Sequence, residues 1–306
     1  MPSVHPDEVE IDVLVVQRLL VEQFPQWAGL PLKRFPSYGT DNALFRLGRE
    51  LYVRLPRLRA EVPTWAIDQI HREGEWLPRL SPHLPFQVPV PVALGDPSED
   101  YPYSWAVYRW LEGETPRRGT VALAHNVATF LGALQRIDTT GAPAVVGRAR
   151  PLAVYDSATR AALSRLHSQI DVASATVAWE RALEAPAWQD TPVWVHGDLL
   201  AANLLLRNDR LSAVLDWGSL CAGDPACDLM IAWSLLAPVR SEFRALLELD
   251  DSTWERGRGW ALSQAVIALP YYLHTNPPMV AHARSAIAGV LADTRPAPAA
   301  VSRRKR

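Results

Sequence analysis

Residues 193–206 of the chain read VWVHGDLLAANLLL, residues 213–218 read AVLDWG, and residues 223–229 read GDPACDL. Apolar runs bracket the tripeptide His196-Gly197-Asp198, and Asn203 follows in the same loop. A short hairpin that turns near Asn208-Asp209 then places Asp216 at the end of the next apolar run. The pattern therefore predicts that Asp198, Asn203 and Asp216 converge at the ends of short strands.

These three side chains suit the transfer of a phosphoryl group. Such a group carries dense negative charge, which Mg²⁺ ions bridge during transfer. Mg²⁺ prefers hard oxygen ligands, and Asn203 and Asp216 can supply them. Asp198 is the carboxylate that can orient a hydroxyl and accept its proton. The alternative is that each residue only shapes a turn, because Asp is common at strand ends.

The whole pattern of His-Gly-Asp, the later Asn, Asp-Trp-Gly and Gly-Asp-Pro-x-x-Asp-Leu resembles the aminoglycoside phosphotransferase family, a branch of the protein-kinase-like fold. The resemblance spans nearly the whole chain. It implies that Asp198 is the catalytic or hydroxyl-orienting residue and that Asn203 and Asp216 bind Mg²⁺. His196 is then expected to pack behind the metal-binding aspartate. Asp224 and Asp228 are expected to brace the loop or cap the following helix.

The nucleotide-binding half has a weaker signature. Arg54 stands where the family has a lysine, and strand alternation puts it opposite Val53 and its apolar neighbours. A cation there can pair the nucleotide phosphates, although Arg differs from Lys in reach and geometry. The expected partner is Glu73, with Glu75 as the competitor. An exposed strand arginine and a surface glutamate are the alternatives.

Two further segments complete the expected nucleotide site. The loop with Ser37 and Gly39 would cover the phosphates, although Gly39 can equally be a turn residue. The segment with Trp110 and Leu111 would be the hinge that offers backbone groups to a purine. Backbone contacts leave no trace in a sequence, so either ATP or GTP could be the phosphoryl donor.

The pattern along the chain predicts an α+β, bilobal protein-kinase-like fold. Strands are expected over 32–36, 43–47, 51–55, 92–94 and 104–110, and helices over 10–24 and 64–80, with 82–91 as an extended linker. Later helices are expected over 121–137, 157–169, 173–183, 225–236, 254–269 and 279–291. This gives a nucleotide-binding lobe over 1–110, a mainly helical catalytic lobe over 111–294 and a disordered basic tail over 295–306.

Composition limits the partners. The formal net charge is -2, which gives no reason to expect nucleic acid as a partner. No apolar run reaches the roughly 20 residues of a membrane span. The two cysteines, Cys221 and Cys227, have no His or Cys neighbours at zinc-ligand spacing. We expect a cytoplasmic protein that is a monomer or a homodimer and binds a nucleoside triphosphate and a small-molecule acceptor.

The acceptor is the least determined feature. The resemblance favours a hydroxyl of an aminoglycoside-type antibiotic, whose positive charges carboxylates would attract. Glu248, Asp250, Asp251 and Glu255 form an acidic cluster, although such a run is usually a solvated face. A macrolide would instead need an apolar site, for which Trp233, Trp260, Tyr271 and Tyr272 are candidates, unless they belong to the core. A sugar, choline-like or homoserine-like acceptor and a weakly active nucleotide-binding pseudoenzyme are the other possibilities.

Overall fold

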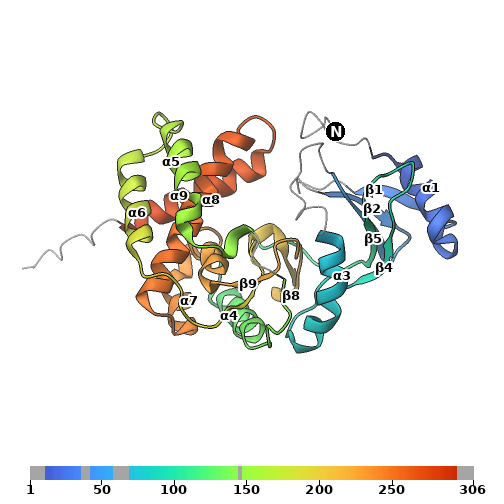
Figure 1. Cartoon of the computed structure of the whole chain (residues 1–306), viewed down its shortest axis with the longest axis horizontal. Coiled ribbons are helices and arrows are strands. Elements are labelled where there is room, and N and C mark those ends of the chain that lie inside the picture. Colours follow the sequence, from blue (N-terminus) through green and yellow to red (C-terminus); the bar gives the residue numbers. More distant parts are fainter. Residues whose placement is uncertain (1–10, 36–41, 58–68, 144–146, 295–306) are drawn as a thin grey trace, which may run out of the picture.

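The computed structural model of the chain describes residues 11–35, 42–57, 69–143 and 147–294. Figure 1 shows a strand-rich lobe formed by the first part of the chain and a larger, mainly helical lobe formed by the rest. The mixed α+β organisation in two lobes confirms the expected fold class. Within the described residues, no helix is both long enough and apolar enough to cross a bilayer.

The N-terminal lobe is built on an antiparallel sheet with strand order β1-β2-β3-β5-β4. Its strands are β1 (Leu32–Phe35), β2 (Asn42–Leu47), β3 (Leu51–Pro56), β4 (Pro91–Gly95) and β5 (Trp105–Arg109). Helix α1 (Val13–Gln23) begins at Asp12, whose carboxylate accepts a hydrogen bond from Val15 N. The apolar side of α1 packs with Val53 and Leu55 in one core, so Arg54 points to the opposite face as alternation requires.

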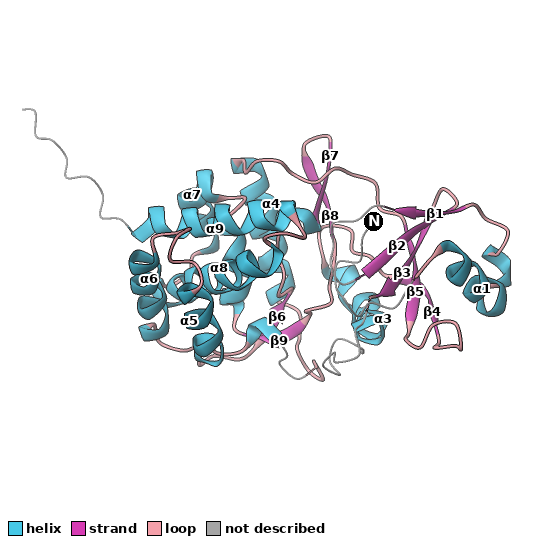
Figure 2. Cartoon of the chain, turned by 90° about the horizontal axis from the view of Figure 1, so that it is seen from above, coloured by secondary structure: helices cyan, strands magenta, loops and turns pink. Residues whose placement is uncertain are grey.

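Helix α3 (Gln69–Leu80) connects the two lobes. Its first half contacts the sheet, where Ile70 packs with Ala106 and Tyr108. Its second half belongs to the core of the other lobe, and the rings of Trp76 and Trp194 lie 4.9 Å apart. Figure 2 shows α3 between the sheet and the β7–β8 hairpin. A residue displaced in this helix therefore disturbs both lobes.

The C-terminal lobe surrounds two small ribbons with helices. Strand β6 (Val193–Val195) pairs with β9 (Cys221–Gly223), and β7 (Leu204–Arg207) pairs with β8 (Arg210–Val214). The turn between β7 and β8 uses Asn208 and Asp209 with positive φ angles, as the hairpin prediction requires. The helices are α4 (Val121–Gln135), α5 (Asp156–Ser164), α6 (Val172–Glu184), α7 (Arg240–Leu247), α8 (Asp251–Tyr272) and α9 (Pro277–Thr294).

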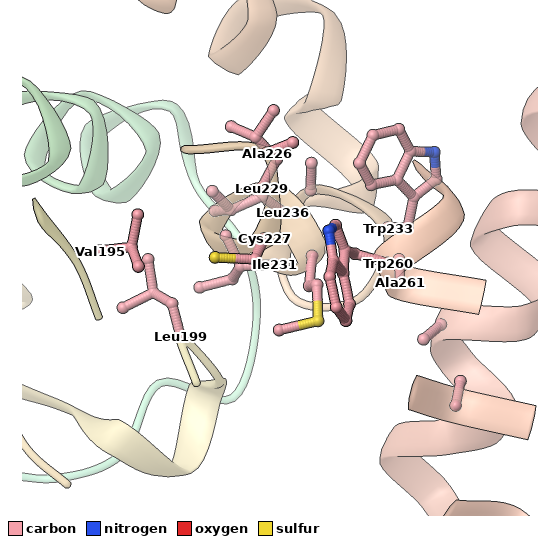
Figure 3. Packing of buried hydrophobic residues seen from close by; sticks show 14 of the residues in the cluster. Val195, Leu199, Ala226, Cys227, Leu229, Ile231, Trp233, Leu236, Trp260 and Ala261 are labelled. Carbon is pink, nitrogen blue, oxygen red and sulfur yellow. The ribbon is translucent and has the colours of Figure 1, made fainter. Parts of the chain in front are cut away.

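The core of this lobe forms around a buried helical segment. The sequence predicts a helix over 225–236, and the structure has one over Pro225–Trp233; it is a 3₁₀ helix, η6, with every residue buried. Figure 3 shows its side chains between Val195 and Leu199 on one side and Trp260 and Ala261 on the other. Neighbours on all sides leave no polar face, so the segment has no amphipathic period from which its helix type could be read.

The structure differs from the expected elements in a few other places. Strand β9 was not expected, because its three residues are too few to show alternation. Helix α7 was not expected either. The expected helix over 157–169 ends at Ser164. The expected linker over 82–91 contains Gln87, which forms a backbone bridge to Ala213 of β8. This bridge adds a second backbone connection between the lobes.

We predict that Gly289→Ala destabilises the protein. A Cβ at Gly289 of α9 would lie 2.1 Å from the carbonyl oxygen of Trp233, so α9 would have to move away from η6. Overpacking of this kind costs about 1–3 kcal/mol, which urea unfolding can measure. The matched control is Gly132→Ala in α4, where the nearest atom is the flexible end of Arg136 at 3.4 Å. That change should stabilise the helix by up to about 1 kcal/mol. Equal effects of the two substitutions would contradict the close packing of α9.

Candidate functional site

Arg54 lies at the centre of a buried ionic cluster between the lobes. Its Nη1 donates to both carboxylate oxygens of Glu73, at 2.7 and 2.8 Å. Its Nη2 lies 3.3 Å from Oδ1 of Asp216, which belongs to the other lobe. The structure therefore pairs Arg54 with Glu73, the expected partner, and adds a contact to Asp216 that the sequence did not indicate. Glu75 instead has an exposed side chain beside Arg79, so Glu73 is the partner of Arg54.

A tyrosine completes this cluster. The hydroxyl of Tyr108 on β5 donates to Glu73 Oε2 at 2.8 Å, and its ring stacks on Tyr52 at 5.0 Å. Burial raises the pKa of Tyr108, and the negative charge of Glu73 raises it further. For Arg54, burial works against the charge, but Glu73 and its neighbours overcome it and hold the pKa well above its ordinary value. The cluster is therefore one buried cation, one buried carboxylate and a neutral phenol. No sequence motif indicated Tyr108.

The loop that carries Asp198 is held by a buried carboxylate. Asp228 Oδ2 accepts from His196 N at 2.8 Å, and its Oδ1 accepts from Gly197 N at 2.7 Å. Burial raises the pKa of Asp228, which these two backbone donors oppose. Asp224 caps η6 by accepting from Ala226 N and pairs with Arg256. Both aspartates thus have contacts of the bracing and capping kind that the sequence suggested.

His196 joins the loop of Asp198 to the loop of Asp216. Its Nδ1 accepts from Asp198 N at 3.2 Å, and its Nε2 donates to the carbonyl oxygen of Leu215 at 2.9 Å. The buried ring packs edge-on against Trp217. Leu215 N also donates to the carbonyl oxygen of Asn203 at 2.7 Å. Asp198, Asn203 and Asp216 therefore lie on adjoining, hydrogen-bonded loops.

The oxygens of Asn203 and Asp216 suit a hard divalent cation. Asn203 Nδ2 donates to the carbonyl oxygen of Asp198 at 2.8 Å, which leaves Oδ1 as the amide atom for a ligand. Asp216 is partly exposed and has a φ of 61°, in the left-handed region that residues other than glycine rarely adopt. Its neighbour Gly218 meets α3, where Arg72 Nη1 donates to the Gly218 carbonyl oxygen at 3.0 Å. Helix α3 therefore holds the Asp216 loop in place.

Arg148, which sequence reasoning did not identify, contacts Asp198 directly. It lies in the short 3₁₀ turn η3 (Gly147–Ala149), and its Nη1 donates to Asp198 Oδ1. The same nitrogen donates to the carbonyl oxygen of Gly197 at 3.0 Å, and its Nε donates to Gln264 Oε1 at 3.0 Å. Arg148 and Gln264 lie in segments far along the chain from Asp198 and stand in no motif, so only the fold brings them to its loop.

The expected hinge is lined with aromatic side chains. Trp110 N donates to the carbonyl oxygen of Glu50 at 2.7 Å, which ties the start of the crossing segment to the sheet. The guanidinium of Arg46 lies 3.8 Å from the centre of the Trp110 ring, and Phe35 and Tyr52 meet the same ring edge-on. Leu111 follows as a partly buried residue. Ser37 and Gly39 lie outside the described residues.

Three of the four residues of the acidic cluster contact other groups, whereas Glu248 ends α7 with an exposed side chain. Asp250 caps α8 through Thr253, and Asp251 pairs with Arg244. Glu255 pairs with Arg258 on the same helix. The aromatic residues considered for an apolar acceptor site differ in exposure. Trp233 and Trp260 are fully buried, whereas Tyr271 is half exposed. These observations favour structural roles for Asp250, Asp251 and Glu255 and for the two tryptophans.

One family model matches most of the chain. The family model described as "Phosphotransferase enzyme family" matches residues 32–260. The chain belongs to the phosphotransferase enzyme family. The matched segment includes every described residue of the ionic cluster and of the two joined loops. No curated protein sequence matches this phosphotransferase.

Solved structures share the fold of this phosphotransferase. The GDP complex of aminoglycoside 2'-phosphotransferase-IIIa has 17% identity and a TM-score of 0.71, covering 93% of this chain and 100% of that chain. The streptomycin–ATP complex of APH(2")-IIa has 20% identity and a TM-score of 0.57, covering 85% and 91%. The macrolide 2'-phosphotransferase MphH from Brachybacterium faecium has 22% identity and a TM-score of 0.59, covering 91% and 97%.

We predict that Glu73→Ala destabilises the phosphotransferase by about 3–5 kcal/mol. The change leaves the Arg54 charge buried without its main partner and removes the acceptor of the Tyr108 hydroxyl. Urea unfolding measures the loss. Glu75→Ala on the same helix is the control, because its exposed pair with Arg79 contributes at most about 0.5 kcal/mol. Similar losses for the two variants would show that the buried pair does not stabilise the fold.

Proposed function

We propose that this phosphotransferase moves the γ-phosphoryl group of ATP or GTP to a hydroxyl of a small molecule, with Asp198 as the catalytic base. The observation that supports this most is the pair of bonds made by His196, which holds the Asp198 loop against the Asp216 loop. An alcohol at Asp198 would then lie beside the ligands Asn203 and Asp216. The Arg54 cation lies on the other side of Asp216.

In the proposed reaction the acceptor oxygen attacks the γ-phosphorus. A new oxygen–phosphorus bond forms, the bond from that phosphorus to the β,γ-bridging oxygen breaks, and the nucleoside diphosphate leaves. The hydroxyl proton passes to the Asp198 carboxylate. Asp198 also orients the hydroxyl for attack, and a positioned base of this kind typically contributes 10²–10⁴-fold.

Asn203 and Asp216 are the residues that would hold Mg²⁺. Bound there, the ion would neutralise charge on the phosphate oxygens. Arg54 complements it, because its guanidinium can bind phosphate oxygens while it remains paired with Glu73. The segment Trp110–Leu111 would adjoin the purine at the boundary between lobes 1–110 and 111–294. The similar structures are named as a GDP complex and an ATP complex, so both purines are donors to test.

Aminoglycoside-type antibiotics are the first acceptors to test, because the family resemblance favours them and one similar structure is named as a streptomycin complex. Macrolides and metabolite alcohols are the second candidates. The observation in their favour is that the acidic cluster is engaged in capping and ion pairs, whereas Arg148 lies against Asp198. The enzyme is also proposed to act in the cytoplasm, as a monomer or a homodimer.

Asp198→Ala should lower the transfer rate by at least 10²-fold, since it removes the proposed base. Nucleotide affinity should stay nearly unchanged, because the side chain of Asp198 does not contact Arg54 or Glu73. Transfer is followed as nucleoside diphosphate release across a panel of aminoglycosides, macrolides and amino alcohols. Asp190→Ala, at an exposed position before β6, is the control. Retention of more than about a tenth of the activity would contradict the assigned role, and no turnover by the unmodified enzyme would favour a pseudoenzyme.

Asp216→Ala should abolish the dependence of nucleotide affinity on Mg²⁺. We expect affinity measured with Mg²⁺ to fall on the order of 10–100-fold, and affinity measured with a chelator to change much less. Titration of ATP and GTP in both conditions checks this. Asp216→Asn, which keeps one oxygen, should retain part of the Mg²⁺ effect. An unchanged response to Mg²⁺ in the alanine variant would argue against Asp216 as a ligand.

A further inference from the structure

Arg148 connects three parts of the catalytic lobe at the proposed base. Its guanidinium binds the carboxylate of Asp198, the carbonyl oxygen of Gly197 and the side-chain oxygen of Gln264 on α8. Both members of its ion pair are partly buried, with side-chain exposures of 29% for Arg148 and 22% for Asp198. Partial burial makes this pair more rigid than a surface ion pair, in which both side chains move in water. Arg148 thus restrains the orientation of Asp198.

The contact distinguishes the two carboxylate oxygens of Asp198. Oδ1 accepts from Arg148, and among the described residues no hydrogen bond reaches Oδ2. In the proposed reaction Oδ2 is therefore the oxygen that accepts the hydroxyl proton. Arg148 also offsets the negative charge of Asp198, so the pair attracts an ammonium group less than an unpaired carboxylate would.

Gln264 adds a hydrogen-bond donor that lacks a partner. Because Arg148 Nε is a donor, the amide of Gln264 must turn its oxygen toward it. The Nε2 atom of Gln264 is buried, and it has no hydrogen-bond partner among the described residues. A buried donor without a partner costs about 1–3 kcal/mol, which an oxygen of a bound molecule would recover. The arrangement therefore suits an acceptor that brings oxygen atoms.

Other charged groups near the pair do not alter this preference. Burial lowers the pKa of His282 on α9; the Asp198 carboxylate raises it and the Arg148 guanidinium lowers it, with a net decrease. The acidic cluster lies elsewhere: Asp251 begins α8 and Gln264 lies past its middle. At about 1.5 Å per residue, Asp251 lies roughly 20 Å and Glu255 roughly 14 Å from Gln264 along the helix. Both separations exceed the screening length of about 8 Å, and Glu255 is paired with Arg258, so neither carboxylate offsets Arg148 for a group held at Gln264.

We propose that Arg148 and Gln264 form an acceptor subsite, in which Arg148 positions Asp198 and both residues favour a hydroxyl flanked by neutral or anionic, oxygen-bearing groups over one flanked by an ammonium group. This inference rests on the proposed function. It narrows the acceptor to a polyol or hydroxy acid, or to a position on an antibiotic that has no neighbouring amine. It also predicts that Arg148 acts on the turnover rate and not on nucleotide binding.

The first test measures positioning. Arg148→Ala should lower kcat for Mg²⁺-dependent nucleotide hydrolysis, with water as acceptor, on the order of 10²-fold, because a misplaced base loses about this much. The Kd for nucleotide should not change. Guanidinium ion at millimolar concentration should restore part of the rate in Arg148→Ala, and Arg148→Lys should retain part of it. Arg150→Ala, which removes an exposed charge from the same loop, is the matched control. Equal rates for Arg148→Ala and Arg150→Ala, or no rescue by guanidinium, would overturn the positioning role.

The second test measures selectivity with sugars of one ring shape: glucose, glucosamine and glucuronate. Binding to the enzyme with a non-hydrolysable nucleotide, followed by NMR saturation transfer, should be at least tenfold weaker for glucosamine than for the other two. Gln264→Glu should reverse this preference. Equal binding of all three sugars, or no detectable binding of any of them, would overturn the proposed preference against an ammonium group. A wild-type enzyme without any Mg²⁺-dependent turnover would overturn the proposed function as well, whereas normal turnover unaffected by Arg148→Ala would overturn this inference alone.

Discussion

The buried ion pair between Arg54 and Glu73 is the constraint on which the arrangement of the two lobes depends. Removing two charges from water is costly, and only close contact and further hydrogen bonds repay that cost. Here the further bonds come from the Tyr108 hydroxyl within the lobe and from Asp216 of the other lobe. Through its contacts with Glu73 and Asp216, Arg54 thus connects the sheet, helix α3 and the loop of Asp216.

The C-terminal lobe holds polar loops rigidly at the edge of an apolar core. The buried carboxylate of Asp228 accepts two backbone donors, and the ring of His196 uses both nitrogens to join two loops. Indole rings and aliphatic residues of η6 and α8 pack around them. A polar framework satisfied in this way fixes one geometry, because any shift would leave a buried donor or acceptor unpaired. The loops that carry Asp198, Asn203 and Asp216 are thereby held in place.

The sequence predicted contacts between residues that are close along the chain or stand in a regular pattern, and it did not predict contacts between distant segments. The loops of Asp198 and Asp216 lie within one short segment, so their spacing alone predicted that they adjoin. Alternation in β3 placed Arg54 on the correct face, and helical spacing favoured Glu73 as its partner but left Glu75 open. Arg148, Gln264 and Tyr108 could not be predicted, because each reaches the site from a distant element and stands in no pattern. The helix type of η6 was also beyond prediction, because a segment buried on every side has no polar face to set a period.

The use of arginine in the ion pair has a chemical consequence. The lysines of the sequence are Lys33, on the exposed side of β1, and Lys305, near the end of the chain. A guanidinium stays protonated at any physiological pH and is a poor nucleophile, whereas an amine reacts with acylating reagents once it loses its proton. A nucleotide-derived affinity label that acylates an amine would find no amine at residue 54.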